Sequence, residues 1–353
     1  MCYPVIVDNL KDSRYFTEET ASYTQESVTR IPVGLVGDMI SIKKYEAPQR
    51  EEWNRLVRES SNGLFLFNRD YMDYHADRFV DHSIMFLEDG QPIALFPANI
   101  DDARALVSHG GLTFGGLIRT PKLRARNILD LFGCLIDTFE TQSFAGILYK
   151  AIPLAFQTQP SEDDLYALHR FGFKLMRRDL SSVVPLDQPT KYSKGRKWSI
   201  GKAAKNNVSV RSDGQLAPFY NMLERRLQTR YAVRPTHSQE ELGLLASRFP
   251  DNIRISCAYL DDFTEPCAGV TLYDCGCTLH TQYMATTEEG RDVGALDFLI
   301  DYHIDEARRL GKRFFSFGIS TENEGMVLNE GLVQQKESFG ALGVIHDFYK
   351  LER

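Results

Sequence analysis

The stretch Phe86–Ala94 reads FLEDGQPIA, and a similar stretch later in the chain, Tyr259–Ala268, reads YLDDFTEPCA. In each of them apolar residues flank an acidic turn, a pattern that predicts two short strands joined by a hairpin. The prolines of the two stretches, Pro92 and Pro266, lie 174 residues apart. This pair of hairpins is the first indication that the chain contains an internal repeat.

Two further pairs of segments recur in the same order. Leu-Ile-Asp occurs at Leu135–Asp137 and again at Leu299–Asp301, 164 residues later, and Phe-Gly occurs at Phe171–Gly172 and again at Phe339–Gly340, 168 residues later. The repeated order of strand pair, helix, strand, helix and strand is typical of mixed α/β layers. We therefore predict an α/β fold with a mixed sheet, built as two similar tandem domains with a ligand cleft between them.

The length of 353 residues suits two domains of average size. We predict a polar N-terminal extension over residues 1–40, a first domain over 41–185, and a second domain over 186–353 that binds the donor and carries the catalytic groups. Apolar periodicity predicts the individual elements. The predicted helices include 64–79, 123–141, 293–310 and 324–337, and the predicted strands include 279–285, 314–319 and 344–351.

The composition is that of an ordinary globular protein, with 43% apolar and 25% charged residues. No apolar run approaches the roughly 18 residues of a membrane span, and the N-terminus lacks the pattern of a signal peptide. Six cysteines without paired CxxC spacing predict free thiols in a reducing compartment and no metal site. We therefore expect a cytoplasmic protein.

The net charge of −7 hides a basic segment. Between Lys191 and Arg234 the chain has eleven Lys or Arg residues against two acids, Asp213 and Glu224, a local charge of +9. This concentration indicates an anionic partner such as a nucleotide diphosphate, coenzyme A or tRNA, although a solvated helix face is the simpler interpretation. A DNA- or RNA-binding protein is disfavoured, because aromatic residues are not interleaved with the basic ones along a long groove.

Several motifs resemble a known group of proteins. Ser193–Val210, Phe315–Ser320 and Leu332–Gly340, the last containing K-x-x-F-G, resemble segments of Fem-type aminoacyl transferases. Ser108–Ile118 and Arg234–Leu242 look like bacterial GNAT proteins of the Fem-like, tandem-domain type. The resemblance covers roughly residues 42–351.

The resemblance implies a tandem GNAT fold and acyl transfer to an amine. In the GNAT-like branch the expected donor is acyl-CoA, and in the Fem branch it is aminoacyl-tRNA with a nucleotide-linked peptidoglycan precursor as acceptor. No heptad run matches the helical arm of some Fem proteins, which makes tRNA the less favoured partner. The leading hypothesis is therefore an acyl-CoA-dependent N-acyltransferase that acts on a small anionic amine, such as a nucleotide-linked amino sugar in surface-polysaccharide synthesis. An aminoacyl-tRNA-dependent transferase and a catalytically inactive GNAT-like binding module are the alternatives.

The resemblance also places the donor. In GNAT folds a backbone group on the strand before the cofactor helix binds the donor carbonyl, which here implies Tyr283 or Met284. The cofactor pyrophosphate is then expected at the start of the next helix, where free N–H groups attract anions. This loop contains Arg291, Gly294 and Ala295, but Leu296 replaces the last small residue of the family pattern.

Three further residues are predicted to act in catalysis. Glu322 follows a buried strand and is the preferred carboxylate base. Thr236 or Ser238, followed by glutamates, predicts a helix cap that places His237 at a helix N-terminus, where a neutral imidazole takes a proton from an ammonium. Lys336, in K-x-x-F-G, is predicted to neutralise an anionic group of the acceptor.

Substrate binding is predicted for a glycine-rich loop, whose backbone a ligand can approach closely, and for cationic and hydroxyl side chains elsewhere. These residues are His109, Gly110, Thr113, Arg196, Lys202, Arg234 and Ser320.

Overall fold

The structure is a computed structural model that describes residues 40–261 and 264–352. Nearly all of the predicted N-terminal extension therefore lies outside the described residues. Contacts within the chain define two compact units. The C-terminal unit contains Pro153–Thr158 and Arg177–Asp347, and the N-terminal unit contains the described residues before Pro153 together with Gln159–Met176 and 348–352.

The N-terminal unit has two small sheets. The first has the order β1-β3-β4-β7, and its neighbouring strands are antiparallel. The second has the order β17-β8-β6-β5-β2, to which β17 (Leu342–Glu352) contributes its C-terminal end. Helix α3 packs its apolar face, including Ile128, Phe132 and Leu135, against these strands. The elements are β1 (Ile40–Lys44), α1 (Arg50–Glu59), α2 (Arg69–Met72), β2 (Val80–Asp81), β3 (Ile84–Glu88), β4 (Gln91–Phe96), β5 (Asn99–Ile100), β6 (Leu106–Val107), β7 (Ile118–Arg119), α3 (Ala125–Thr141), β8 (Gly146–Lys150) and α4 (Asp163–Arg170).

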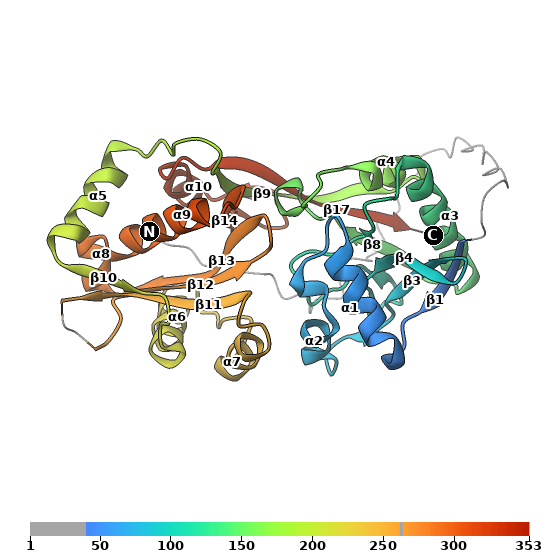
Figure 1. The fold of residues 1–353 in the computed structure, drawn as a ribbon, viewed down its shortest axis with the longest axis horizontal. Helices are drawn as coiled ribbons and strands as arrows, with labels where there is room; N and C mark the ends of the chain where they lie inside the picture. The colour runs from blue at the N-terminus through green and yellow to red at the C-terminus, as the bar shows by residue number, and fades with distance from the viewer. Residues whose placement is uncertain (1–39, 262–263, 353) are drawn as a thin grey trace. The chain divides into compact units, whose positions relative to one another are not determined.

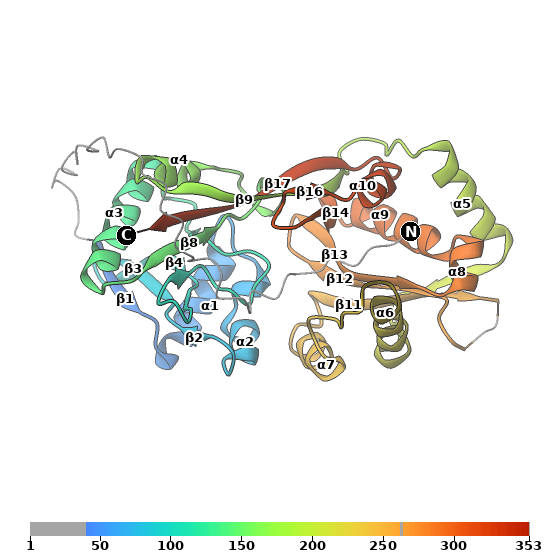
Figure 2. The same ribbon diagram turned by 180° about the vertical axis from the view of Figure 1, so that it is seen from behind.

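The C-terminal unit has a large sheet with helices on both faces and a separate two-stranded sheet of β15 and β16. The strand order of the large sheet is β10-β11-β12-β13-β14-β9-β17, in which β13 and β14 are parallel. Helix α9 covers one face, and α6 and α7 cover the other, as Figures 1 and 2 both show. The elements are β9 (Lys174–Pro185), α5 (Lys194–Lys205), β10 (Val208–Arg211), α6 (Leu216–Tyr231), α7 (Gln239–Arg248), β11 (Ile253–Leu260), β12 (Ala268–Asp274), β13 (Thr278–Thr286), α8 (Glu288–Val293), α9 (Ala295–Arg309), β14 (Phe314–Ile319), β15 (Thr321–Glu322), β16 (Val327–Leu328), α10 (Glu330–Glu337) and β17 (Leu342–Glu352).

The internal repeat is confirmed by the order of the elements. β8, α4 and β9 of the first copy begin at residues 146, 163 and 174, and β14, α10 and β17 of the second begin at 314, 330 and 342. The copies exchange their last strands: β9 pairs with β14, and β17 pairs with β8. The chain therefore passes into the C-terminal unit at Arg177 and returns to the N-terminal unit at Phe348. The domain boundary predicted from the sequence was residue 186.

Two predicted helices are shorter than expected. The helix predicted over 293–310 begins only at Ala295, because Gly294 has φ +80° and separates it from α8. The helix predicted over 324–337 begins only at Glu330, since Asn323, Glu324 and Gly325 all have positive φ.

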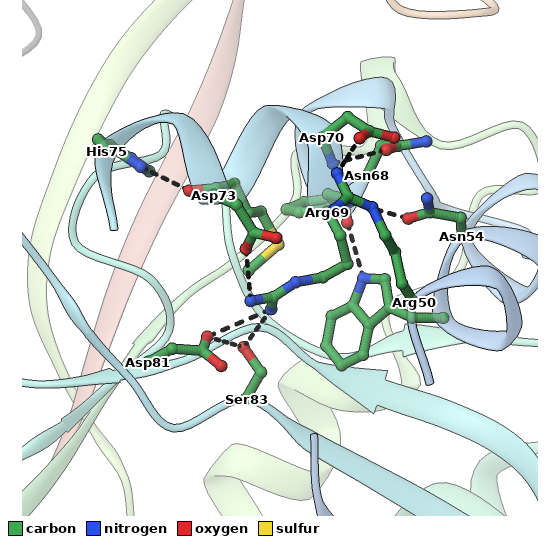
Figure 3. A network of polar contacts seen from close by, with 12 residues as sticks. Arg50, Asn54, Asn68, Arg69, Asp70, Asp73, His75, Asp81 and Ser83 are labelled. Atoms are coloured by element: carbon green, nitrogen blue, oxygen red, sulfur yellow. Dashed lines mark hydrogen bonds and ion pairs between the residues drawn. The ribbon is translucent and has the colours of Figure 1, made fainter. Parts of the chain in front are cut away.

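The segment 64–79 was predicted as a helix and instead forms short turns around Arg69 (Figure 3). The Arg69 guanidinium is buried and donates to Asp73 at 2.7 Å and to Asp81 and Ser83, both at 3.2 Å. It also lies 3.9 Å from the ring centroid of Tyr45. Satisfying one buried charge from several directions requires the chain to turn, which a continuous helix does not allow.

Candidate functional site

A small crevice opens in the C-terminal unit where β13 and β14 separate. Their parallel pairing ends at His280 and Ser316, and a register shift after Ser316 follows in the pairing of β14 with β9. Separated strands leave backbone N–H and C=O groups available to a ligand. The crevice is lined by Met284, Leu296, Asp297, Ile300, Phe317, Leu332, Gln335, Lys336 and Phe339.

Lys336 is the ionisable amine of this crevice. Only 2% of the residue is exposed, and its Nζ donates to the carbonyl oxygens of Gly318 and Ile319 at 2.9 and 2.5 Å. Burial lowers the pKa of Lys336 well below its ordinary value, because desolvation disfavours the charged ammonium. An amine with a lowered pKa gives up its proton more readily than an ordinary lysine, and its free form is a base.

His280 lies close to Lys336 and was not predicted as a site residue from the sequence. Its Nδ1 is 3.1 Å from the Oγ of Ser316, and that Oγ accepts a hydrogen bond from the backbone N–H of Gly318 at 3.3 Å. The carbonyl of the same Gly318 accepts from Lys336, so the contacts run from the imidazole to the amine. One signal in the sequence could have identified His280: the segment Thr278–Gln282 is polar except for Leu279. In the structure all five of these residues are buried in the strand β13.

The pKa of His280 predicts part of the acid sensitivity of the fold. Burial, and then the charge of Lys336, lower this pKa from 6.5 to about 4. The unfolded chain therefore binds the extra proton first, and the free energy of unfolding should fall by about 3 kcal/mol from this residue as the pH drops from 6.5 to 4. Urea titrations across this range should show a shallower fall in His280→Gln, and equal pH dependence in both proteins would contradict the assignment.

His237 and Tyr283, both predicted as catalytic, are brought together by the fold. The Nδ1 of His237 lies 2.6 Å from the hydroxyl oxygen of Tyr283. His237 precedes α7, and the predicted helix cap is confirmed, with Ser238 and Glu241 as a reciprocal capping box. Tyr283 belongs to the core beneath α6 and α7, whereas Met284 belongs to the core beneath α9. The His237–Tyr283 pair and the Met284 side chain of the crevice therefore lie on opposite faces of β13.

Comparisons with known proteins identify the kind of domain in which these residues lie. Residues 196–324, which include β13, α9 and β14, match the family model described as an acetyltransferase (GNAT) domain. This segment is a GNAT domain. No curated protein matched the chain.

Solved structures show the same fold over most of the chain. FemX is 11% identical, with a TM-score of 0.64 over 88% of this chain and 97% of FemX. A C-terminal domain assigned to a lysylphosphatidylglycerol synthetase of Agrobacterium fabrum is 14% identical, with a TM-score of 0.57 over 86% of this chain and 92% of that domain. A tandem GNAT protein from the clavulanic acid biosynthesis pathway is 10% identical, with a TM-score of 0.50 over 89% and 98% of the two chains. The fold is thus that of Fem-like, tandem GNAT proteins.

The entrance of α9 in the GNAT domain is filled by α5. A Cβ atom on Gly294 would lie 2.5 Å from the Oγ of Ser199 and 2.6 Å from its carbonyl oxygen. Ser199 donates to the Asp297 carboxylate at 2.6 Å, and Arg196 forms an ion pair with the same carboxylate. Ala295 is completely buried. α9 thus presents a carboxylate and a packed backbone where the sequence placed a pyrophosphate.

GNAT domains generally bind acyl-CoA, and these residues do not fit its pyrophosphate. Ser199 occupies the space in front of Gly294, and Arg196, the nearby cation, is already paired with Asp297. Of the predicted cofactor residues, Met284 lines the crevice and Arg291 is exposed beside Glu288, whereas Gly294 and Ala295 are closed off. The structure therefore brings one of the four to the crevice.

The remaining predicted residues of the C-terminal unit lie at several places. Glu322 is exposed in β15, where its carboxylate accepts from the Asn329 amide. Ser320 follows Ile319 and is completely buried, and its hydroxyl has no hydrogen-bond partner among the described residues. Arg234 is exposed, and Lys202 donates to the carbonyl of Asp292.

The predicted substrate loop of the N-terminal unit is held from inside. Lys150 is buried and donates to the carbonyl oxygens of His109 and Leu112. His109 has φ +43° and is 3% exposed, and its Nδ1 has no hydrogen-bond partner within the described part of the chain. The Gly110 N–H donates to Asn99 at 2.6 Å, and Thr113 is half-buried. The fold therefore fixes the conformation of this loop.

Within the described ranges, 40–261 and 264–352, no helix is long and apolar enough to cross a membrane. The same residues contain no cluster of His, Cys, Asp or Glu side chains suited to a metal ion.

Proposed function

We propose that this protein transfers an aminoacyl group from aminoacyl-tRNA to the amine of a small anionic acceptor. The observation that carries the proposal is the closure of the α9 entrance by Ser199 next to a crevice that retains a buried lysine, whose pKa burial lowers. Acyl-CoA, the donor favoured by the sequence analysis, becomes the second candidate. The likeness of fold to FemX and to a lysylphosphatidylglycerol synthetase supports this order.

In the proposed reaction the acceptor amine attacks the ester carbonyl of the donor. An N–C bond forms, the C–O bond to the ribose breaks, and the amine loses a proton. Lys336 accepts this proton at Nζ and returns it to the leaving ribose oxygen. The edge of β13 that faces away from β12, beyond the end of its pairing with β14 at His280, would bind the carbonyl oxygen as charge develops on it.

The proposed acceptor is the class of molecule that was expected from the sequence. A primary amine on an anionic molecule, such as a nucleotide-linked amino sugar, fits the basic segment Lys191–Arg234. Surface-polysaccharide synthesis is the proposed setting, and the cytoplasm, where such donors and acceptors meet, is the proposed location.

The direct test is a transfer assay. Bulk tRNA charged with radiolabelled amino acids is incubated with the protein and with panels of amino sugar nucleotides, aminolipids and amino-terminal peptides. We expect label to move into an amine-containing product, and prior treatment with ribonuclease to abolish the transfer. Transfer of an acyl group from acetyl-CoA to the same panel, without transfer from tRNA, would overturn the proposal in favour of the second candidate.

A thermal-shift titration tests the donor separately. Acetyl-CoA, longer acyl-CoAs and free CoA should leave the Tm unchanged, because Ser199 occupies the space in front of Gly294. A ligand at 100 times its Kd would stabilise the fold by about 2.7 kcal/mol, which such a titration detects easily. A saturable rise in Tm with CoA would count against the closed entrance.

A further inference from the structure

Helix α5 is fixed to the C-terminal unit by polar contacts on one face. Arg196 pairs with Asp297, donates to Ser338 at 2.7 Å, and lies 4.1 Å from the ring centroid of Phe339. Ala203 is the only fully buried residue of the helix. A helix that buries so little apolar surface contributes little to the core, so the residues on its opposite face are not explained by packing.

The opposite face is basic along its whole length. Lys194, Lys197 and Lys205 are exposed and recur at the spacing of one helix face, and no acidic residue occurs between Lys191 and Asn207. At 1.5 Å per residue, the distance from Lys194 to Lys205 is about 16 Å, close to that of five stacked nucleotides at about 3.4 Å each.

Trp198 lies in the middle of this face and is 68% exposed. Lys202, one turn later, lies 5.3 Å from the indole centroid and donates its Nζ to the carbonyl of Asp292. The ammonium of Lys202, itself held by Asp292, therefore contacts one side of the indole, while most of the Trp198 surface remains in solvent. An exposed indole is a flat, rigid surface on which the ring of a partner stacks favourably.

We propose that the outward face of α5 binds single-stranded RNA, with a base stacked on Trp198 and phosphates paired with Lys194, Lys197 and Lys205. Stacking is tolerant of sequence and strong on indole, and lysines on one face follow a phosphate backbone. A lipid surface is a poorer fit, since an interfacial helix needs an apolar stripe and this face has a single large apolar residue. The inference rests on the proposed function, because the RNA would be the single-stranded end of the donor.

The test measures binding and needs no turnover. The probe is an eight-nucleotide, fluorescently labelled single-stranded RNA, and its anisotropy is followed at several salt concentrations. Lys194→Glu/Lys197→Glu should weaken binding at least tenfold and flatten the slope of log K against log salt by about 1.4, since each lost contact removes about 0.7. Trp198→Ala should weaken binding about tenfold, whereas Trp198→Phe should retain most of it.

Matched controls come from exposed residues outside α5. Lys122→Glu/Lys174→Glu makes the same change of charge, and Tyr166→Ala removes an aromatic ring that is 56% exposed. Both should bind RNA like the unmodified protein. Trp53 is fully buried, so quenching of the intrinsic tryptophan fluorescence on adding RNA reports on Trp198.

The outcomes separate this inference from the proposed function. Equal affinity of the α5 variants and their controls would overturn the RNA surface and leave the transfer reaction standing. RNA binding that depends on α5, without any transfer from aminoacyl-tRNA, would support the surface and overturn the reaction. Absence of RNA binding, with α5-dependent binding to phosphatidylglycerol vesicles, would overturn the surface in favour of a membrane.

Discussion

Replacing Lys336 by Met should lower kcat for transfer by about 10²- to 10⁴-fold, the usual contribution of a general acid–base group. The amine is buried and held by the carbonyls of Gly318 and Ile319, and burial lowers its pKa well below its ordinary value, which favours its role as a base. Met has a similar length and volume but no proton acceptor. Single-turnover measurements with charged tRNA would report the chemical step directly.

The same substitution should leave the fold intact. Met removes a costly buried amine but leaves the carbonyls of Gly318 and Ile319 without their donor, so the free energy of unfolding of Lys336→Met should fall by no more than about 1–3 kcal/mol. Lys312 is the matched control, because it is largely buried in the same unit and donates to Asp274 and to the carbonyl of Gly276. Lys312→Met should keep its kcat, and an unchanged kcat in Lys336→Met would remove the residue from the reaction.

Replacing Arg69 by Met should lower the free energy of unfolding by about 3–5 kcal/mol. The substitution leaves Asp73 and Asp81 without their cation (Figure 3). It also removes the guanidinium from the ring of Tyr45 and from the neighbourhood of Trp53. Urea denaturation followed by circular dichroism would measure the loss.

Arg50 provides the comparison within the same network. It pairs with Asp70, but both side chains are more than 40% exposed. Arg50→Met should therefore change the free energy of unfolding by less than about 1 kcal/mol. Equal losses in the two variants would show that the contacts of Arg69 do not stabilise the fold beyond those of a surface pair.

Much of the architecture could be predicted from local patterns. The paired hairpins at Phe86–Ala94 and Tyr259–Ala268 and the recurring helices predicted an α/β fold built twice, which the structure confirms. The capping box at Ser238 was also predictable, because a cap depends only on residues within one turn. The prediction of a helix over 64–79 was wrong because the conformation there depends on residues outside the segment. The buried charge of Arg69 is satisfied in part by Asp81 and Ser83.

The candidate site depended on contacts between distant parts of the chain. The sequence indicated Lys336 through K-x-x-F-G, but not that its amine is buried against Gly318 and Ile319. His280 carried no motif, and its relation to Lys336 appears only where β13 and β14 separate.

By itself, therefore, the amino-acid sequence determined the repeated α/β architecture, the helix caps and the basic segment, because periodicity, capping and charge are properties of neighbouring residues. Only the tertiary structure decided that the repeats exchange their last strands, that Ser199 of α5 packs against Gly294, and that Lys336 is buried. The physical reason is the same in each case: strand pairing, steric exclusion and desolvation depend on which distant segments are brought into contact.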